Sequence, residues 1–146
     1  MINNILNFED VSEGMEIPTI EFGPITRQQL VDYASASGDY NKIHYDESFA
    51  KKAGLKGCIT HGMLSMAITG SFITNWAKRA TLKNFKVRFS GITNENDILT
   101  IKGRVSKKFV QDNEHLIEIQ FQSLTQEKVV IIMGSALILL NSKSTT

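Results

Sequence analysis

The sequence predicts an α+β fold in which an antiparallel sheet wraps around a central apolar helix. The first half of the chain carries helical periodicity, and residues 60–78 are apolar around most of the helix circumference. The second half changes to a period of two, which is typical of half-buried antiparallel strands. A nearly all-apolar helix needs a sheet to cover it, and helix on one face of an antiparallel sheet is the α+β layout.

Composition sets the outer limits of the prediction. The chain has 146 residues, of which 42% are hydrophobic and 21% charged, so we expect a single globular domain over residues 1–146. The net charge of +1 argues against bulk electrostatic binding to nucleic acid or an anionic membrane. Cys58 is the only cysteine, which excludes an intrachain disulfide. No signal peptide or long apolar stretch is evident, so we expect a cytoplasmic location.

The first elements are indicated by proline, capping and glycine signals. A short strand or edge segment is predicted at 19–23, between the two prolines. Thr26 and Gln29 form a capping-box pattern that predicts a helix through about Ala36. Gly38 then marks the end of that helix.

Two further helices follow. Asp46 is the expected N-cap of a short helix that stops at Gly54, with three residues facing inward: Phe49, Ala50 and Ala53. A longer helix is expected from Thr60 to about Lys78, buried on nearly all sides.

Three segments then alternate apolar and polar residues, and a fourth is apolar throughout. The alternating segments lie at 85–89, 99–105 and 117–121, and turn residues separate them. Residues 129–140 are continuously apolar, which favours a central strand covered on both faces. The apolar surface left on so small a sheet predicts a second copy of the subunit, and therefore a homodimer or higher homo-oligomer.

The candidate chemistry lies between the first and the long helix. Asp39, Asn41 and His44 share one short loop, and a carboxylate and an imidazole five residues apart suggest an acid/base pair. Gly62 opens the apolar helix, where a free backbone N–H can hold an anion or an oxyanion. Together these residues indicate chemistry on an activated carbonyl compound.

The segment SGDYNKIHYDESFAKKAGLKGCITHGML resembles the signature of the MaoC-like (R)-specific enoyl thioester hydratases and dehydratases, which adopt the hot-dog fold. The similarity continues in TRQQLVDYASASGD and FKVRFSGIT and extends over roughly residues 8–140. It is nearest to the B-type catalytic subunits of (3R)-hydroxyacyl-acyl-carrier-protein dehydratases. The resemblance implies a hydro-lyase that reversibly adds water to trans-2-enoyl-CoA or enoyl-ACP in fatty-acid metabolism, without a metal or another cofactor.

Within this resemblance, the family's catalytic aspartate falls on Asp39 and its catalytic histidine on His44. The asparagine between them falls on Asn41, and the glycine whose amide holds the thioester carbonyl falls on Gly62. The chain departs from the family at Lys42, where a proline is usual.

These residue types suit the implied reaction. A histidine, with an ordinary pKa of about 6.5, exchanges protons near neutrality, and an aspartate beside it can hold the same water. A backbone N–H at a helix start stabilises the oxygen of the forming enolate. We expect a tunnel for the acyl chain around Met63, Met66 and Ile68.

Other interpretations of the same residues stay open. Asp39 and His44 are also explained as ordinary loop residues, Asn41 as a residue that only fixes the loop, and His61 as a helix cap rather than a catalyst. Four lysines form either a solvated face or a contact for coenzyme A phosphates or an acidic carrier protein: Lys42, Lys51, Lys52 and Lys56.

Other classes of function also remain. The chain is alternatively the catalytic or acyl-binding subunit of a hetero-oligomeric dehydratase. It is alternatively a hot-dog thioesterase or an acyl-binding module without enzymatic activity.

Overall fold

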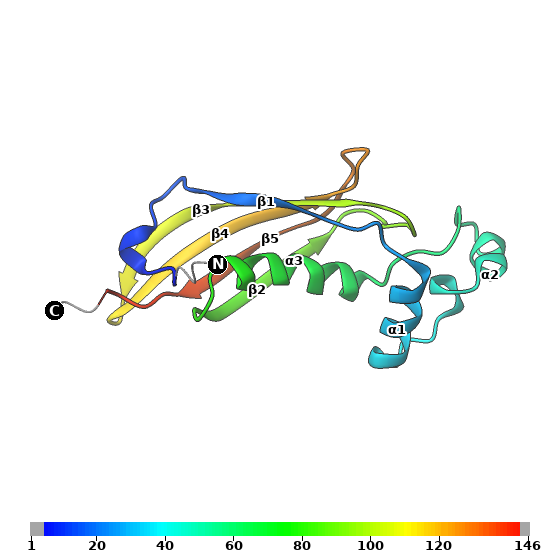
Figure 1. The fold of residues 1–146 in the computed structure, drawn as a ribbon, viewed down its shortest axis with the longest axis horizontal. Helices are drawn as coiled ribbons and strands as arrows, with labels where there is room; N and C mark the ends of the chain where they lie inside the picture. The colour runs from blue at the N-terminus through cyan, green and yellow to red at the C-terminus, as the bar shows by residue number, and fades with distance from the viewer. Residues whose placement is uncertain (1–4, 144–146) are drawn as a thin grey trace.

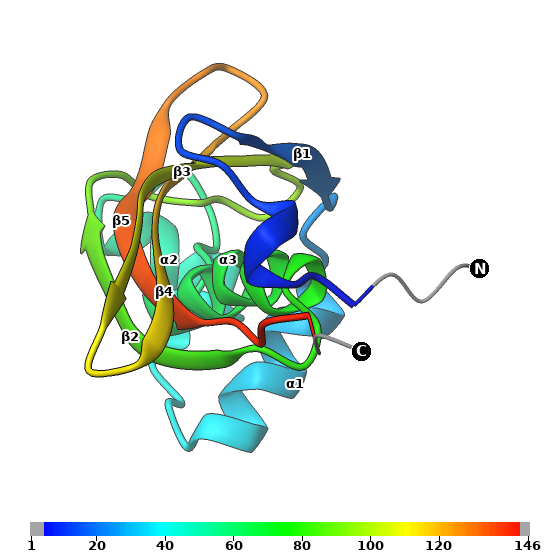
Figure 2. The ribbon, with the colours of Figure 1, turned by 90° about the vertical axis from the view of Figure 1, so that its left-hand side faces the viewer.

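A computed structural model describes residues 5–143 of the chain. Within them, a curved antiparallel sheet with strand order β1-β3-β4-β5-β2 wraps around one long helix, α3 (Figures 1 and 2). The strands are β1 (Glu16–Phe22), β2 (Thr81–Phe89), β3 (Leu99–Gln111), β4 (Glu114–Leu124) and β5 (Val130–Leu139). The helices are η1 (Phe8–Asp10), α1 (Arg27–Ser37), η2 (Lys42–His44), α2 (Glu47–Lys52) and α3 (Gly62–Trp76). The predicted α+β class is confirmed.

The core lies between α3 and the concave face of the sheet. Alternate residues of β3 and β4 point inward and are fully buried, as the sequence periodicity predicts: Leu99, Ile101, Val105, Ile117 and Ile119. On α3, Phe72 and Ile73 complete this layer. Gly103 lets the helix approach the sheet, because a Cβ there would lie 3.2 Å from the Phe72 ring and 3.0 Å from the Gln120 carbonyl oxygen.

Several predicted boundaries are confirmed by the capping geometry. Thr26 and Gln29 form the reciprocal capping box of α1, and Gly38 ends that helix with a left-handed φ of 75°. Asp46 caps α2 by accepting a hydrogen bond from Phe49 N–H. The predicted edge segment belongs to β1, an edge strand of the sheet.

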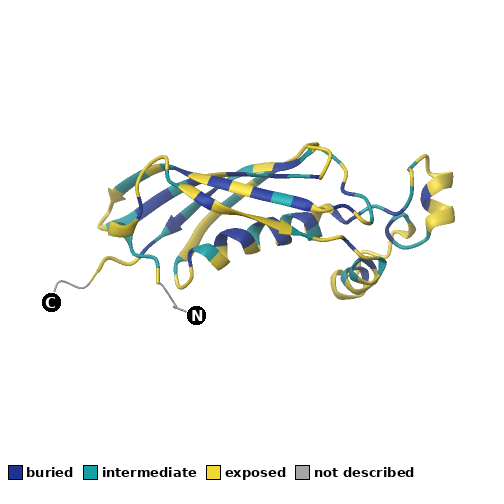
Figure 3. Cartoon of the chain, turned by 45° about the horizontal axis from the view of Figure 1, so that its top comes forward, coloured by how far each residue is buried: buried dark blue, intermediate teal, exposed yellow. Residues whose placement is uncertain are grey.

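Several predicted burials are wrong. α3 is buried only where it faces the sheet, and its other side is exposed, including Met63 at 57% (Figure 3). Phe49 on α2 and Phe89 on β2 are also exposed, at 44% and 48%. The outer face of β5 is open at Met133. Apolar composition reports what a surface can bury, whereas coverage depends on neighbours that sequence periodicity does not reveal.

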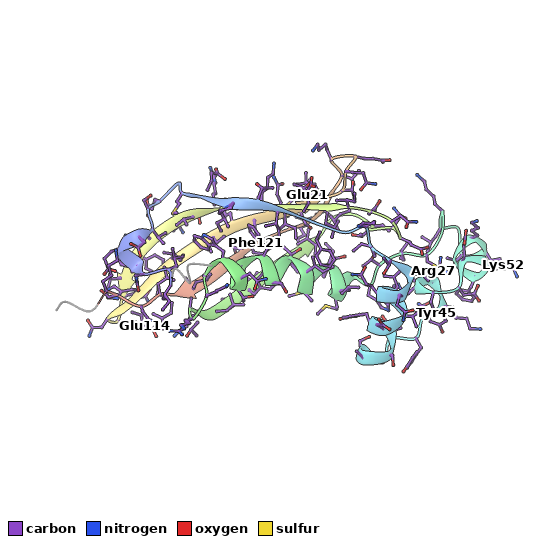
Figure 4. The ribbon with its side chains drawn as sticks, viewed as in Figure 1. Glu21, Arg27, Tyr45, Lys52, Glu114 and Phe121 are labelled. Carbon is purple, nitrogen blue, oxygen red and sulfur yellow. The ribbon has the colours of Figure 1, made fainter. Side chains whose placement is uncertain are left out.

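Residues 38–61, which we call the overhang, project with α1 beyond one end of the sheet (Figure 1). Figure 4 shows Arg27 and Tyr45 side by side at this end, and Arg27 donates a hydrogen bond to the Tyr45 carbonyl oxygen at 3.0 Å. Within the described chain, no helix combines the length and hydrophobicity needed to cross a membrane.

Candidate active site

Asp39 and His44 face each other within the overhang. Asp39 Oδ2 lies 3.8 Å from His44 Nε2, which is too long for a direct hydrogen bond and close to the separation of two groups that share one water. The Asp39 side chain is 55% exposed, whereas that of His44 is only 8% exposed. The pair therefore combines a fixed imidazole with a carboxylate that is open to solvent and ligand.

The other polar atoms of Asp39 are held by its neighbours. Its N–H donates to Ser37 Oγ at 3.2 Å, and its Oδ1 accepts from Asn41 N–H at 3.2 Å. Its carbonyl oxygen lies 3.2 Å from His61 Nε2. These contacts leave Oδ2 facing His44. Oδ1 therefore holds the loop through the Asn41 N–H, and Oδ2 is available to bind a ligand.

His44 is fixed with a defined tautomer. Its Nδ1 lies 2.8 Å from the Ile59 carbonyl oxygen, which can only accept, so Nδ1 carries a proton. In the neutral ring, Nε2 is then the unprotonated nitrogen, and it is the one that faces Asp39. Asp39 and His44 are thus two acceptors aimed at one point, an arrangement suited to binding and deprotonating a water molecule.

Asn41 shapes the loop between these residues. Its Oδ1 accepts from Ile43 N–H at 3.2 Å and so caps η2, and its carbonyl oxygen accepts from His44 N–H. Lys42 occupies the first position of this short helix. A proline is favoured there because its missing N–H has no helical partner.

The start of α3 lies beside the pair, because its N-cap is His61 and the His61 ring stacks on His44 with centroids 3.6 Å apart. The first backbone N–H groups of a helix have no acceptor within it, and Gly62 supplies the first of them in α3. A Cβ at Gly62 would lie 3.4 Å from the Phe89 ring. His61 occupies the predicted cap position of α3, although its side chain makes no capping hydrogen bond.

Burial lowers the pKa of the His61 imidazole. The residue is 2% exposed, and this desolvation outweighs the opposing hydrogen bond to the Asp39 carbonyl oxygen, with His44 adding a smaller lowering contribution. Asp39, His44 and His61 bring one possible ligand atom each within 4.8 Å. A zinc ion binds in the plane of an imidazole ring. The His44 and His61 rings are stacked 3.6 Å apart and inclined by 21°, so their planes intersect well beyond metal–ligand bonding distance. In this arrangement the two rings do not bind one zinc ion.

An apolar groove of about 310 Å³ runs between α1 and α3. Tyr33, Leu64 and Ile68 contribute to its lining, and the Tyr33 ring also packs against His61, with centroids 4.9 Å apart. The three residues predicted to line a tunnel lie in different surroundings. Ile68 lines this groove, Met66 packs against the core, and Met63 is exposed.

Arg27 fastens the overhang to the connection between β2 and β3. Besides its bond to the Tyr45 carbonyl oxygen, it contacts Glu95 at 2.5 Å and Glu47 at 4.0 Å. Burial lowers the pKa of the guanidinium, but the Glu95 hydrogen bond outweighs it and raises the pKa above its ordinary value. Because Tyr45 follows His44 in the chain, this clamp also holds the loop that presents the imidazole.

The site therefore contains residues that the sequence indicated and residues that it did not. Asp39, Asn41, His44 and Gly62 gather at one end of α3. Sequence reasoning missed the stacking of His61 and the clamp made by Arg27. The only available signal for His61 was its position directly before Gly62.

Comparison with known proteins is consistent with this geometry. A family model described as MaoC like domain matches residues 11–127. The chain belongs to the MaoC-like domain family. The predicted family is thereby confirmed, and with it the coarse assignment as a domain of the hydratase and dehydratase type.

Relatives of this MaoC-like domain include much longer proteins. It is 33% identical over 123 residues to fatty acid synthase subunit beta of Saccharomyces cerevisiae, covering 82% of this chain and 6% of that protein. It is 42% identical over 74 residues to the peroxisomal hydratase-dehydrogenase-epimerase of Neurospora crassa, covering 51% of this chain and 8% of that protein. The domain thus spans only a small part of these relatives.

Among solved structures, the R-hydratase PhaJ1 from Pseudomonas aeruginosa superposes with a TM-score of 0.85. The sequence identity is 22%, and the match covers 94% of this chain and 86% of that one. This similarity confirms the predicted hot-dog fold of the MaoC-like domain.

Proposed function

We propose that this domain catalyses the reversible addition of water to a trans-2-enoyl thioester, giving the (R)-3-hydroxyacyl thioester. The observation that carries the proposal is the orientation of Asp39 Oδ2 and His44 Nε2 toward one point, 3.8 Å apart, beside the start of α3. Family membership supports a hydro-lyase. The thioester substrate is inferred from family membership, and a helix N-terminus beside the acid/base pair supports chemistry on an activated carbonyl compound.

In the hydration direction, Asp39 and His44 hold one water molecule between them. The water oxygen bonds to C3 of the enoyl group, one of its protons passes to the pair, and a proton is delivered to C2. The C2–C3 double bond becomes a single bond, and dehydration is the reverse. Because one water supplies both parts, hydroxyl and proton reach the same face of the alkene.

Negative charge develops on the thioester oxygen as C3 is attacked. The Gly62 N–H, at the first position of α3, is the proposed donor to this oxygen. Gly62→Pro removes that N–H at a helix position that tolerates proline, whereas Gly62→Ala adds a Cβ and keeps the donor. We expect kcat to fall about 100-fold more in Gly62→Pro than in Gly62→Ala. Equal losses would assign the effect to the added carbon and remove the oxyanion role.

The groove between α1 and α3 is the proposed site for the acyl chain. Its apolar lining reaches Tyr33, which contacts His61 and therefore lies next to the catalytic pair. Lys42 and Lys52 are exposed on the overhang, where they are available to coenzyme A phosphates or to an acidic carrier protein. Lys51 is already paired with Glu47 at 2.6 Å. Charge reversal at Lys42 and Lys52 should raise KM for the thioester without changing kcat.

We also propose that the domain works as a homodimer. β2 pairs only with β5 among the described strands, so one edge of β2 is unpaired, and Met63 and Phe89 are exposed nearby. A second copy would cover this edge and these side chains. Light scattering should give twice the chain mass, and Phe89→Lys should reduce it. A monomer that becomes active only with a different subunit would instead support a hetero-oligomer.

Hydration of crotonyl-CoA, followed as loss of the enoyl absorbance with determination of product chirality, tests the function. Asp39→Asn removes the carboxylate charge, and His44→Asn keeps a donor for the Ile59 carbonyl oxygen while removing Nε2. Both variants should lose most activity. Asp112→Asn and His115→Asn, on the β3–β4 hairpin far from the pair, are matched controls that should stay active. Folded wild type that releases free thiol instead would identify a thioesterase.

A further inference from the structure

His61 contacts both members of the proposed catalytic pair through different parts of its ring. One face stacks on the His44 imidazole at 3.6 Å with an interplanar angle of 21°, and Nε2 lies 3.2 Å from the Asp39 carbonyl oxygen. The residue is 2% exposed. The His61 side chain thus contacts the ring of one partner and the backbone of the other.

These contacts define how His61 carries its proton. The Asp39 carbonyl oxygen can only accept, so His61 Nε2 bears the hydrogen. Nδ1 is buried without a hydrogen-bond partner. In the neutral ring Nδ1 is an unpaired acceptor, whereas in the imidazolium it would be a buried, unpaired N–H with a positive charge beside it. The neutral Nε2–H tautomer is therefore strongly favoured.

We propose that His61 is a positioning residue for the Asp39–His44 pair, with two separable effects. Its Nε2–H anchors the backbone of Asp39, and its ring supports the face of the His44 imidazole. This inference rests on the proposed function for its catalytic meaning. The two contacts themselves are properties of the folded chain and can be measured without turnover.

The surroundings of His61 agree with this role. The titratable groups that face it are Asp39, His44 and Tyr33, from the loop after α1, from η2 and from α1. Of these three groups, only Asp39 carries a carboxyl group. The His61 ring lies against the face of the His44 imidazole and so limits how that imidazole can tilt. Two charged imidazoles at this distance would repel each other.

Two substitutions separate the contacts. His61→Gln places an N–H near the position of Nε2 and removes the ring, whereas His61→Phe keeps a ring and removes the donor. In His61→Gln the stack is lost, so the ring-proton resonances of His44 should move downfield and kcat for crotonyl-CoA should fall about 10-fold with little change in KM. In His61→Phe the stack remains, so those resonances should stay upfield of their positions in His61→Gln, while kcat still falls about 10-fold because the Asp39 backbone loses its donor.

Nitrogen-detected NMR of the imidazoles reads the tautomer of each ring directly, the ring-proton resonances of His44 report the stack, and His115 is an internal reference. Wild type should show His61 as the Nε2–H tautomer and His44 as the Nδ1–H tautomer. An Nδ1–H tautomer for His61, or His44 ring-proton resonances that do not move in His61→Gln, would overturn the inference. If these spectra appear as expected in a protein that does not hydrate crotonyl-CoA, the proposed function fails and the positioning contacts stand.

Wild-type values of kcat, KM and pH profile in both variants would also overturn the inference. Thermal unfolding of each variant shows whether a loss of activity is a loss of folded protein. If His61→Phe does not fold, the His44 ring-proton resonances in His61→Gln decide the matter by themselves.

Discussion

The body formed by the sheet and α3 is held together differently from the overhang that carries the proposed catalytic pair. The body buries aliphatic side chains of several strands against the helix. In the overhang, residues 38–61, the buried hydrophobic residues are only Ala50 and Cys58. Its other buried residues are polar, and hydrogen bonds fix its shape.

Because of this difference, the interactions that stabilise the fold are not the ones that orient the groups of the proposed site. Hydrophobic burial is roughly proportional to area and does not depend on direction, so it stabilises the body without placing single atoms. Hydrogen bonds are directional and can hold one carboxylate oxygen opposite one ring nitrogen. Substitutions in the body should therefore lower stability with little effect on kcat, whereas those that disturb the hydrogen bonds around Asp39 and His44 should lower kcat.

The largest effect on stability is expected in the body. Ile119 on β4 is fully buried, and Ile119→Ala should lower the free energy of unfolding by about 3 kcal/mol. The kcat of the folded fraction should stay within about twofold of wild type, because no contact of the pair is altered. Urea unfolding and kinetics below the midpoint measure both. A tenfold loss of kcat in fully folded protein would contradict the separation.

The clamp between overhang and body should give an intermediate result. Arg27→Met keeps the aliphatic stem but removes the bonds to the Tyr45 carbonyl oxygen and Glu95, which should cost about 2 kcal/mol of stability and lower kcat. Lys51→Met is the matched control, since it breaks only an exposed pair with Glu47 and should cost under about 0.5 kcal/mol. Similar losses in both variants would show that the clamp has no special role.

Two N-caps within the overhang give a sharper comparison. Asn41→Ala and Asp46→Ala each remove one side-chain cap, from η2 and from α2, and each should cost about 1 kcal/mol of stability. Only Asn41 lies between the two proposed catalytic residues, so only its variant should lose kcat, by about 10-fold. Equal kcat values in the two variants would mean that the geometry of η2 does not matter to the reaction.

The smallest effect is expected from restoring the usual proline at Lys42. Asn41 has φ −61° and ψ 121°, a conformation compatible with a following proline, and Lys42 begins η2. Lys42→Pro should raise the free energy of unfolding by about 0.5 kcal/mol, because proline reduces the conformational entropy of the unfolded chain. The value of kcat should be unchanged. Destabilisation would indicate that the Lys42 N–H or side chain has a partner in solution.

The sequence was informative where the deciding interactions are local. Asp39 and His44 are five residues apart, and Thr26 and Gln29 form a capping box within one turn, so their proximity follows from the chain itself. Strand alternation likewise predicted the buried set on β3 and β4. These signals depend on neighbours in sequence and need no knowledge of the tertiary fold.

The remainder depends on contacts that no local pattern encodes. His61 reaches His44 because the segment before α3 bonds back to η2, through Ile59 N–H to the Ile43 carbonyl oxygen. Arg27 and Glu95 are 68 residues apart. The exposure of Met63 was likewise unpredictable, since an apolar residue does not reveal whether anything covers it.

The two ends of the described fold meet far from the overhang. Asn7 and Asn141 form a parallel bridge, and Phe8 N–H donates to the Asn141 carbonyl oxygen at 2.8 Å, at the opposite end from α1 and α2 (Figures 1 and 2). A polypeptide entering and leaving here passes through one small patch of surface. Further polypeptide joined at these two positions would therefore lie at the end of the domain opposite the Asp39 carboxylate and would leave access to that carboxylate open.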